Sequence, residues 1–192
     1  MDALHIDAAR TALVIIDLQK GIVAMPTAPH EARAVILNAA KLADAFRKKK
    51  MPVFLVHVTP SVDMKDALRP AADNPMQRSS PMAPEWAELV PEMGPESDDF
   101  VITKRQWGAF YGTELDLQLR RRGVDTIVLC GISTNIGVES TARFAYELGY
   151  QQVFVEDAMA AHSKDAHDHT VQTTFPRIGR VRTTDEILAA LA

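Results

Sequence analysis

Three stretches of this sequence place chemically capable groups directly after short apolar runs. Asp17 follows the run 12–16, and Lys104 follows the run 100–103. The third stretch is a glycine-containing turn, 131–137, which follows another apolar run and opens a helical pattern. The first N–H groups of a helix lack intrahelical partners, and the helix dipole adds partial positive charge there. Such a turn can stabilise a developing negative charge.

Taken singly, the two charged residues have structural explanations. An aspartate at a strand end can cap the following turn, and a lysine there can be an ordinary surface residue. Together, Asp17 and Lys104 indicate a paired site. An opposite charge within about 4–6 Å favours the ionised form of each group, whereas burial favours the neutral form. Which effect is larger decides whether Asp17 acts as a base or as an acid, and the sequence leaves both roles open.

The elements that must position these groups alternate between strands and helices. From apolar periodicity and helix-end signals we expect strands at 12–16, 53–58, 100–103, 126–130, 153–156 and 178–182. We expect helices at 31–50, 84–90, 114–122, 137–148, 162–174 and 185–191. This order predicts an α/β fold of three layers, with a six-stranded parallel sheet covered by helices on both faces. Ligands bind at the carboxyl ends of such strands, which gathers Asp17, Lys104, the turn and Asp157 at one edge.

The bulk composition predicts one soluble globular domain over residues 1–192. The chain is 47% hydrophobic and 24% charged, with a net charge of −4 and no long basic block, which argues against a nucleic-acid partner. No apolar run approaches the ~18 residues of a membrane span, and the acidic N-terminus does not resemble a signal peptide. We therefore expect a cytoplasmic protein with no membrane partner.

The segment 59–99 interrupts the regular alternation. It holds seven of the chain's eleven prolines. Long irregular loops inside a compact domain usually cover a site or contact a partner. We interpret this segment as a lid or an oligomer contact within the single domain.

Other chemically capable residues have structural interpretations. Cys130 lies inside a predicted strand, before the turn, and is expected to be a small core residue. His162, His167 and His169 suggest a metal site. However, His162 and His169 are seven residues apart, which is two helical turns, and His167 and His169 point to different sides of a helix. We interpret all three as part of a solvated helix face and expect no metal or other cofactor. Trp107 follows Lys104 by three residues and is expected to line a pocket.

The sequence resembles the isochorismatase-like hydrolase superfamily, which includes the nicotinamidases and other cysteine hydrolases. Three segments carry this resemblance in the same order over nearly the whole chain: ALVIIDLQ at 12–19, KRQWGAFYGT at 104–113 and CGISTNIGVESTA at 130–142. The resemblance implies a Rossmann-like topology, catalytic roles for Asp17 and Lys104, and a cis peptide bond between Ile132 and Ser133. With the segment 59–99, it also implies a homo-oligomer.

The same resemblance places the nucleophilic cysteine of the cysteine hydrolases at Gly137. A glycine cannot form the acyl intermediate that those enzymes need. The isochorismatase branch also has glycine there and hydrolyses an enol ether without a covalent intermediate, with the aspartate as general acid. That branch carries a tyrosine and a histidine in the turn where this chain has Ser133, Thr134 and Asn135, so the resemblance does not name the substrate.

We therefore expect a hydrolase of a small anionic metabolite, with catalytic positions at Asp17, Lys104 and Gly137. The expected substrate contacts are Gln19, Trp107, Ile132, Ser133 and Asn135. Two alternatives stay open. One is an amide or carbamoyl hydrolase that activates water with Asp17 as base, and the other is a non-catalytic protein that binds a small molecule.

Overall fold

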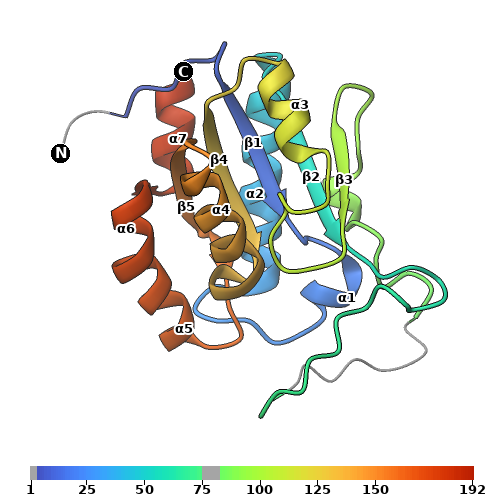
Figure 1. Ribbon diagram of the computed structural model, residues 1–192. Helices are drawn as coiled ribbons and strands as arrows, with labels where there is room; N and C mark the ends of the chain where they lie inside the picture. The colour runs from blue at the N-terminus through green and yellow to red at the C-terminus, as the bar shows by residue number, and fades with distance from the viewer. Residues whose placement is uncertain (1–3, 75–82) are drawn as a thin grey trace.

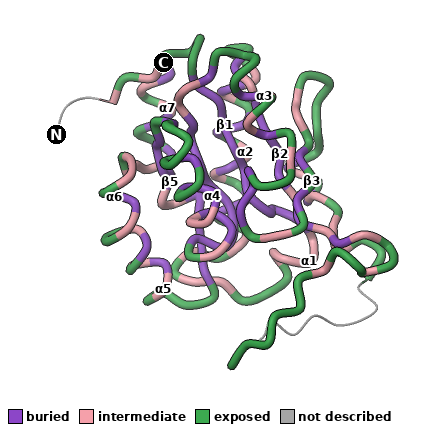
Figure 2. The backbone as a smooth tube through the Cα atoms, in the orientation of Figure 1, coloured by how far each residue is buried: buried purple, intermediate pink, exposed green. Residues whose placement is uncertain are grey.

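The computed structural model describes residues 4–74 and 83–192. Its centre is a six-stranded, all-parallel sheet in the order β3-β2-β1-β4-β5-β6. Figure 1 labels β1 to β5 of this sheet. The strands are β1 (Thr11–Ile16), β2 (Val53–Val58), β3 (Phe100–Lys104), β4 (Thr126–Ile132), β5 (Gln151–Ala160) and β6 (Arg180–Arg182). The predicted fold class is confirmed. The central strands are buried along their length because helices cover both faces (Figure 2).

Helices form the two outer layers. They are α1 (Lys20–Val23), α2 (Ala32–Lys48), α3 (Leu115–Arg121), α4 (Glu139–Glu147), α5 (Lys164–His169), α6 (Phe175–Ile178) and α7 (Thr184–Leu191). A 3₁₀ turn, η1 (Pro91–Met93), and two π-helical turns, η2 (Thr134–Val138) and η3 (Thr170–Thr174), complete the set. In Figure 1, α3 and α4 lie in front of the sheet, and α2 lies behind it, where it also packs against α7.

The longest helix shows why the predicted pattern folds this way. In α2 the buried residues recur with helical spacing, at Val35, Ile36, Ala39, Leu42, Ala43 and Phe46. These side chains form one apolar stripe that packs against the sheet. Basic residues occupy the last turn of the helix, where the dipole favours them.

The helix predicted at 84–90 is wrong. Residues 84–87 form turns, and Leu89 makes an antiparallel bridge with Gln19. The N–H groups of Lys20 and Gly21 donate to the carbonyls of Glu88 and Trp86. The backbone of this stretch therefore pairs with the chain after β1 rather than with itself.

The predicted helix at 162–174 begins two residues later and is interrupted. Ser163 is the N-cap of α5, and its Oγ accepts from the N–H of Ala166. His162 thus lies before the helix. The π-helical turn η3 follows α5, and α6 continues through Ile178, where the last strand was expected to begin.

Part of the predicted insertion, residues 75–82 of the segment 59–99, lies outside the described residues. Among residues 4–74 and 83–192, no helix is both long enough and apolar enough to cross a membrane.

Candidate active site

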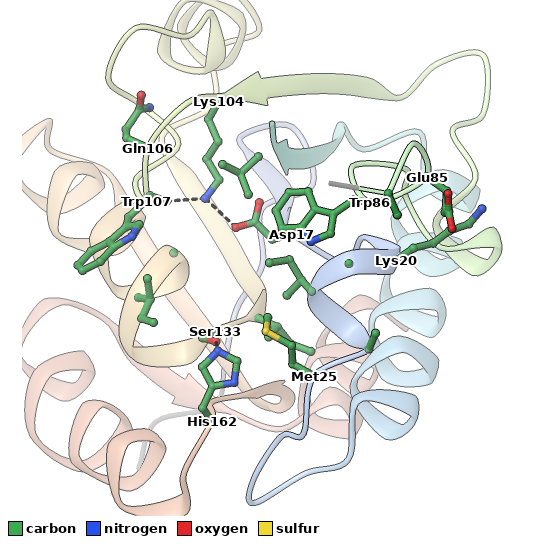
Figure 3. A pocket seen from close by; sticks show the side chains of 18 of the residues that line it. Asp17, Lys20, Met25, Glu85, Trp86, Lys104, Gln106, Trp107, Ser133 and His162 are labelled. Atoms are coloured by element: carbon green, nitrogen blue, oxygen red, sulfur yellow. Dashed lines mark hydrogen bonds and ion pairs between the residues drawn. The ribbon is translucent and has the colours of Figure 1, made fainter. Parts of the chain in front are cut away.

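A buried ion pair lies at the carboxyl end of the sheet. Asp17 directly follows β1, and its Oδ2 lies 2.8 Å from Nζ of Lys104, the last residue of β3. Only 5% of Asp17 and 1% of Lys104 is exposed. Lys104 Nζ also donates to the carbonyl of Trp107, so two acceptors orient the ammonium group (Figure 3). The structure thus brings together the two charged residues that the sequence singled out.

The strand order explains why the basic partner is a lysine. β2 lies between β1 and β3, and Val58 of β2 is in register with Lys104. Neighbouring strands are about 4.8 Å apart, so the backbones of β1 and β3 are separated by about 10 Å. The long lysine side chain passes the end of β2 to reach Asp17.

The turn after β4 forms the third side of the site. The Ile132–Ser133 peptide bond is cis, and η2 begins at the next residue. Gly131 has φ of 121°, and a Cβ there would lie 2.1 Å from the carbonyl oxygen of Ile16. Glycine is therefore required for the turn to approach β1.

Gly137, within η2, faces the ion pair directly. A Cβ at this position would lie 3.1 Å from Oδ2 of Asp17 and 3.2 Å from Nζ of Lys104. Any side chain at position 137 would therefore start beside both charged groups. Glycine leaves that space open, so position 137 supplies no nucleophilic side chain beside the carboxyl and ammonium groups.

A cavity of about 930 Å³ opens onto this arrangement. Its wall combines the three predicted stretches with α1 and with part of the segment 59–99. Besides Asp17, Lys104 and Gly137, the lining includes Lys20, Met25, Glu85, Trp86, Gln106, Trp107, Ile132, Ser133 and His162. Figure 3 shows most of these side chains around one space. The cavity offers charged, hydrogen-bonding and aromatic surfaces to a small molecule.

Three of the five predicted contact residues, Trp107, Ile132 and Ser133, line this cavity, whereas Gln19 and Asn135 do not. Asn135 is exposed elsewhere on the turn. Gln19 is fully buried: its Nε2 donates to the carbonyls of Val58 (3.0 Å) and Trp86 (3.2 Å), and its Oε1 accepts from the N–H of Val58 (2.8 Å). The amide thus holds the Trp86 segment against β2 instead of facing the cavity.

The structure also places Trp86 in the cavity wall. Its indole lies on the backbone of Gly21, where an added Cβ would come within 2.0 Å of Cδ1 of the ring. A glycine at 21 and a tryptophan 65 positions later carry no recognisable signal in the sequence, because only the folded chain brings them together.

The interpretation of the histidines as one solvated helix face is wrong for two of them. His162 lies before α5 in the cavity wall, with its Nε2 3.5 Å from Oγ of Ser133. His167 is only 2% exposed, and its Nδ1 lies 2.8 Å from Oγ1 of Thr134. The delayed start of α5 and the packing of its inner face against η2 account for both positions.

The predicted place of Asp157 at the site is also wrong. β5 continues beyond it to Ala160, and Oδ1 of Asp157 accepts from the N–H (2.7 Å) and the Oγ1 (2.8 Å) of Thr184. This carboxylate therefore stabilises the start of α7. In contrast, the core assignment of Cys130 is confirmed: the residue is fully buried, and burial raises the pKa of its thiol.

Comparisons with known proteins agree with this architecture. The family described as Isochorismatase domain matches residues 11–186. The uncharacterized isochorismatase family protein YwoC of Bacillus subtilis is 56% identical over 189 residues, 98% of this chain and 97% of that protein. The uncharacterized isochorismatase family protein YecD of Escherichia coli O157:H7 is 52% identical over 189 residues, 98% of this chain and 100% of that protein. A solved isochorismatase family protein from Burkholderia thailandensis is 46% identical and superposes with a TM-score of 0.93 over 99% of each chain.

Proposed function

The chain belongs to the isochorismatase family of hydrolases, and on that basis we propose that it hydrolyses a small anionic metabolite by enol-ether chemistry without a covalent enzyme intermediate. The observation that carries this proposal is the space at Gly137, where a Cβ would lie 3.1 Å from Oδ2 of Asp17 and 3.2 Å from Nζ of Lys104. A site built this way has a proton donor next to the cavity but no thiol or hydroxyl at that point to attack a carbonyl group.

In the proposed reaction, Asp17, which pairs with Lys104 as a carboxylate in the resting site, first takes up a proton and then transfers it to the vinyl carbon of the enol ether. The double bond supplies the electron pair, and positive charge develops on the carbon bonded to the ether oxygen. Water then adds to that carbon and gives a proton to the Asp17 carboxylate. The resulting hemiketal breaks down to a ketone and an alcohol as its hydroxyl proton passes to the departing oxygen. A positioned general acid of this kind contributes about 10²–10⁴-fold to the rate.

The role proposed for Lys104 is to orient the acid and to stabilise its conjugate base. Its Nζ is held by Oδ2 of Asp17 and by the carbonyl of Trp107. Proton transfer leaves Asp17 as a carboxylate beside the Lys104 ammonium group. Charge interactions in this buried site are stronger than in water. Backbone N–H groups near Ser133 and Gly137 would polarise the substrate.

The cavity wall supports an anionic substrate with an apolar part. His162 and Lys20 add basic groups to the wall beyond the Asp17–Lys104 pair, and Nζ of Lys20 also lies 2.5 Å from Oε2 of Glu88. Trp86, Trp107 and Met25 provide apolar surface for a carbon skeleton. The single acid of the wall other than Asp17 that the structure describes is Glu85.

The test is a panel of anionic enol ethers, amides and ureas incubated with the protein, with the products detected by mass spectrometry. Turnover of an enol ether whose rate falls as pH rises supports the proposal, because the reaction needs protonated Asp17. Turnover of an amide or urea with a rate that rises with pH supports the alternative, in which Asp17 activates water. If no compound is converted while one raises the Tm, the protein is a binding member of the fold.

Three further features stay proposals: a homo-oligomer, a cytoplasmic location, and the role of the segment 59–99 as a lid or oligomer contact. Light scattering on the purified protein tests the oligomeric state. Removal of an oligomer contact within 59–99 would convert the assembly to monomers.

A further inference from the structure

A second group of chemically capable side chains lies outside the cavity. His30 comes from the loop before α2, Glu156 from β5 and His167 from α5. One ligand atom from each residue lies within 4.8 Å of the other two. None of the three is among the described residues that line the cavity. Two imidazoles and a carboxylate from three distant parts of the chain therefore converge at a place that the proposed hydrolysis does not use.

The spacing of these atoms is close to that around a bound metal ion. Oε2 of Glu156 lies 3.3 Å from Nε2 of His30 and 3.9 Å from Nε2 of His167. Zinc binds histidine nitrogen and carboxylate oxygen at about 2.0–2.2 Å, so neighbouring ligand atoms in a tetrahedron are about 3.3 Å apart. We propose that His30, Glu156 and His167 form a binding site for a divalent transition-metal ion of the zinc type, with water as the fourth ligand.

The hydrogen bonding of His167 supports this assignment. Its Nδ1 lies 2.8 Å from Oγ1 of Thr134, which leaves Nε2 as the atom that faces Glu156. Metal-binding histidines usually donate their other ring N–H to a nearby oxygen, which fixes the tautomer and the ring orientation. Thr134 provides that oxygen here.

The exposure of the three side chains also fits a metal site. His167 is a buried anchor with 3% of its side chain exposed, whereas 30% of His30 and 32% of Glu156 is exposed. An ion can therefore enter from solvent on the side of the two outer ligands. The His30 and His167 rings are nearly perpendicular, at 84°, with centroids 5.6 Å apart.

The charge of the cluster suits a cation. Glu156 contributes a carboxylate, and its Oε2 faces Nε2 of both imidazoles. One carboxylate and two imidazoles are a donor set that zinc and its neighbours favour.

An ion at this position would act on the structure of the turn. Thr134 is the first residue of η2, directly after Ser133 of the cavity wall. By fixing His167, the ion would hold Oγ1 of Thr134 and with it the start of the turn. The role is thus structural, and the proposal does not depend on which reaction the cavity catalyses.

The experiment uses the full chain without an affinity tag, stripped with EDTA and titrated with ZnCl₂ and CoCl₂. We expect one ion per chain by calorimetry, an increase in Tm, and the visible absorption bands of tetrahedral Co²⁺. H30Q and E156Q should each weaken binding about 10- to 100-fold. H169Q is the matched control, because His169 is an exposed histidine at the end of the same helix.

The proposal is overturned if Zn²⁺ and Co²⁺ give no heat and no spectral change, which would make the cluster a hydrogen-bonded network only. It is also overturned if H30Q and E156Q bind as tightly as the unmodified chain, since the ion then sits elsewhere. Equal losses in H169Q and H30Q would point to non-specific surface binding and would likewise contradict it. The outer ligands are chosen because replacing the buried His167 could prevent folding.

Discussion

The two ends of the parallel sheet both carry an ion pair next to β1, but in opposite environments. At the carboxyl end, Asp17 and Lys104 are almost completely buried beside a cavity. At the amino end, Nε of Arg10 donates to Oδ2 of Asp125 at 2.8 Å, and 58% and 36% of the two side chains are exposed. The first pair lies in a low-dielectric site, whereas the second is screened by water.

The backbone makes the amino-terminal pair dispensable. The carbonyl of Arg10 already accepts from the N–H groups of Asp125 and Thr126, both at 3.1 Å, so β1 and β4 are joined without the side chains. For the Asp17–Lys104 pair, the attraction between the charges is offset by the cost of removing them from water, which is several kcal/mol per ion. A chain that keeps such a pair gains little stability from it, which is why we attribute the pair to chemistry.

The largest expected effect is on turnover. D17N removes the proton donor, and we expect kcat/KM on the substrate found in the panel to fall by about 10²–10⁴-fold. D125N, which removes a carboxylate at the other end of the sheet, is the control and should keep its activity. If D17N were as active as the unmodified chain, the buried ion pair at the carboxyl end of the sheet would have no role in the reaction.

The next effect is on stability. D17N leaves the Lys104 ammonium buried without its anionic partner, which should reduce the free energy of unfolding by about 3–5 kcal/mol in urea denaturation. The double variant D17L/K104M removes both charges and should recover most of that loss while remaining inactive. A double variant as unstable as D17N would mean that the pair itself stabilises the fold.

A third prediction uses the open space at Gly137. In G137C the thiol would start beside Lys104 Nζ, since a Cβ there lies 3.2 Å from it, and the ammonium favours the thiolate. We expect iodoacetamide to label G137C at neutral pH, as measured by mass spectrometry. The unmodified chain is the control: its only cysteine, Cys130, is fully buried, and burial raises the pKa of that thiol. An unlabelled G137C would show that position 137 does not face the cavity.

The smallest effect is expected at the amino end. The hydrogen bond from Arg10 lowers the pKa of Asp125 below its ordinary 3.8, so the pair adds stability above pH 3.8. That contribution is lost as the pH falls through the lowered pKa of the folded state. The Tm of D125N should therefore be only slightly below that of the unmodified chain at pH 7, and the gap should close in strong acid. If D125N lowered the Tm at pH 7 as much as D17N does, the exposed pair would stabilise the fold as strongly as the buried one, which would contradict this prediction.

Much of the fold followed from local patterns. Apolar runs at 12–16 and 126–130 are typical of strands buried on both faces, and the stripe that includes Val35, Ile36 and Phe46 is typical of a helix that packs on the core. The parallel order then placed Asp17 and Lys104 at one edge. These features were predictable because strand and helix periodicities depend on neighbours in the chain.

The failures share one cause. The 84–90 stretch has helix-like composition, but its carbonyls bond to the backbone at 20 and 21. Gln19 reads as a polar residue beside a site, yet its amide is used by Val58 and Trp86. His167 reads as a surface histidine, yet it faces Thr134 and Glu156. Each outcome depends on a partner at least 33 positions away, such as Thr134 for His167, which no local pattern contains.

By itself, the sequence determined the layered α/β fold, the edge where chemistry is possible, and the absence of a side chain at Gly137, because composition and periodicity act along the chain. Only the tertiary structure decided that Asp17 and Lys104 are in contact at 2.8 Å, that Trp86 lines the cavity, and that His30, Glu156 and His167 lie close together. Those contacts join segments that are far apart in the chain. The segments meet only when the sheet and the helices on both of its faces pack around a common core.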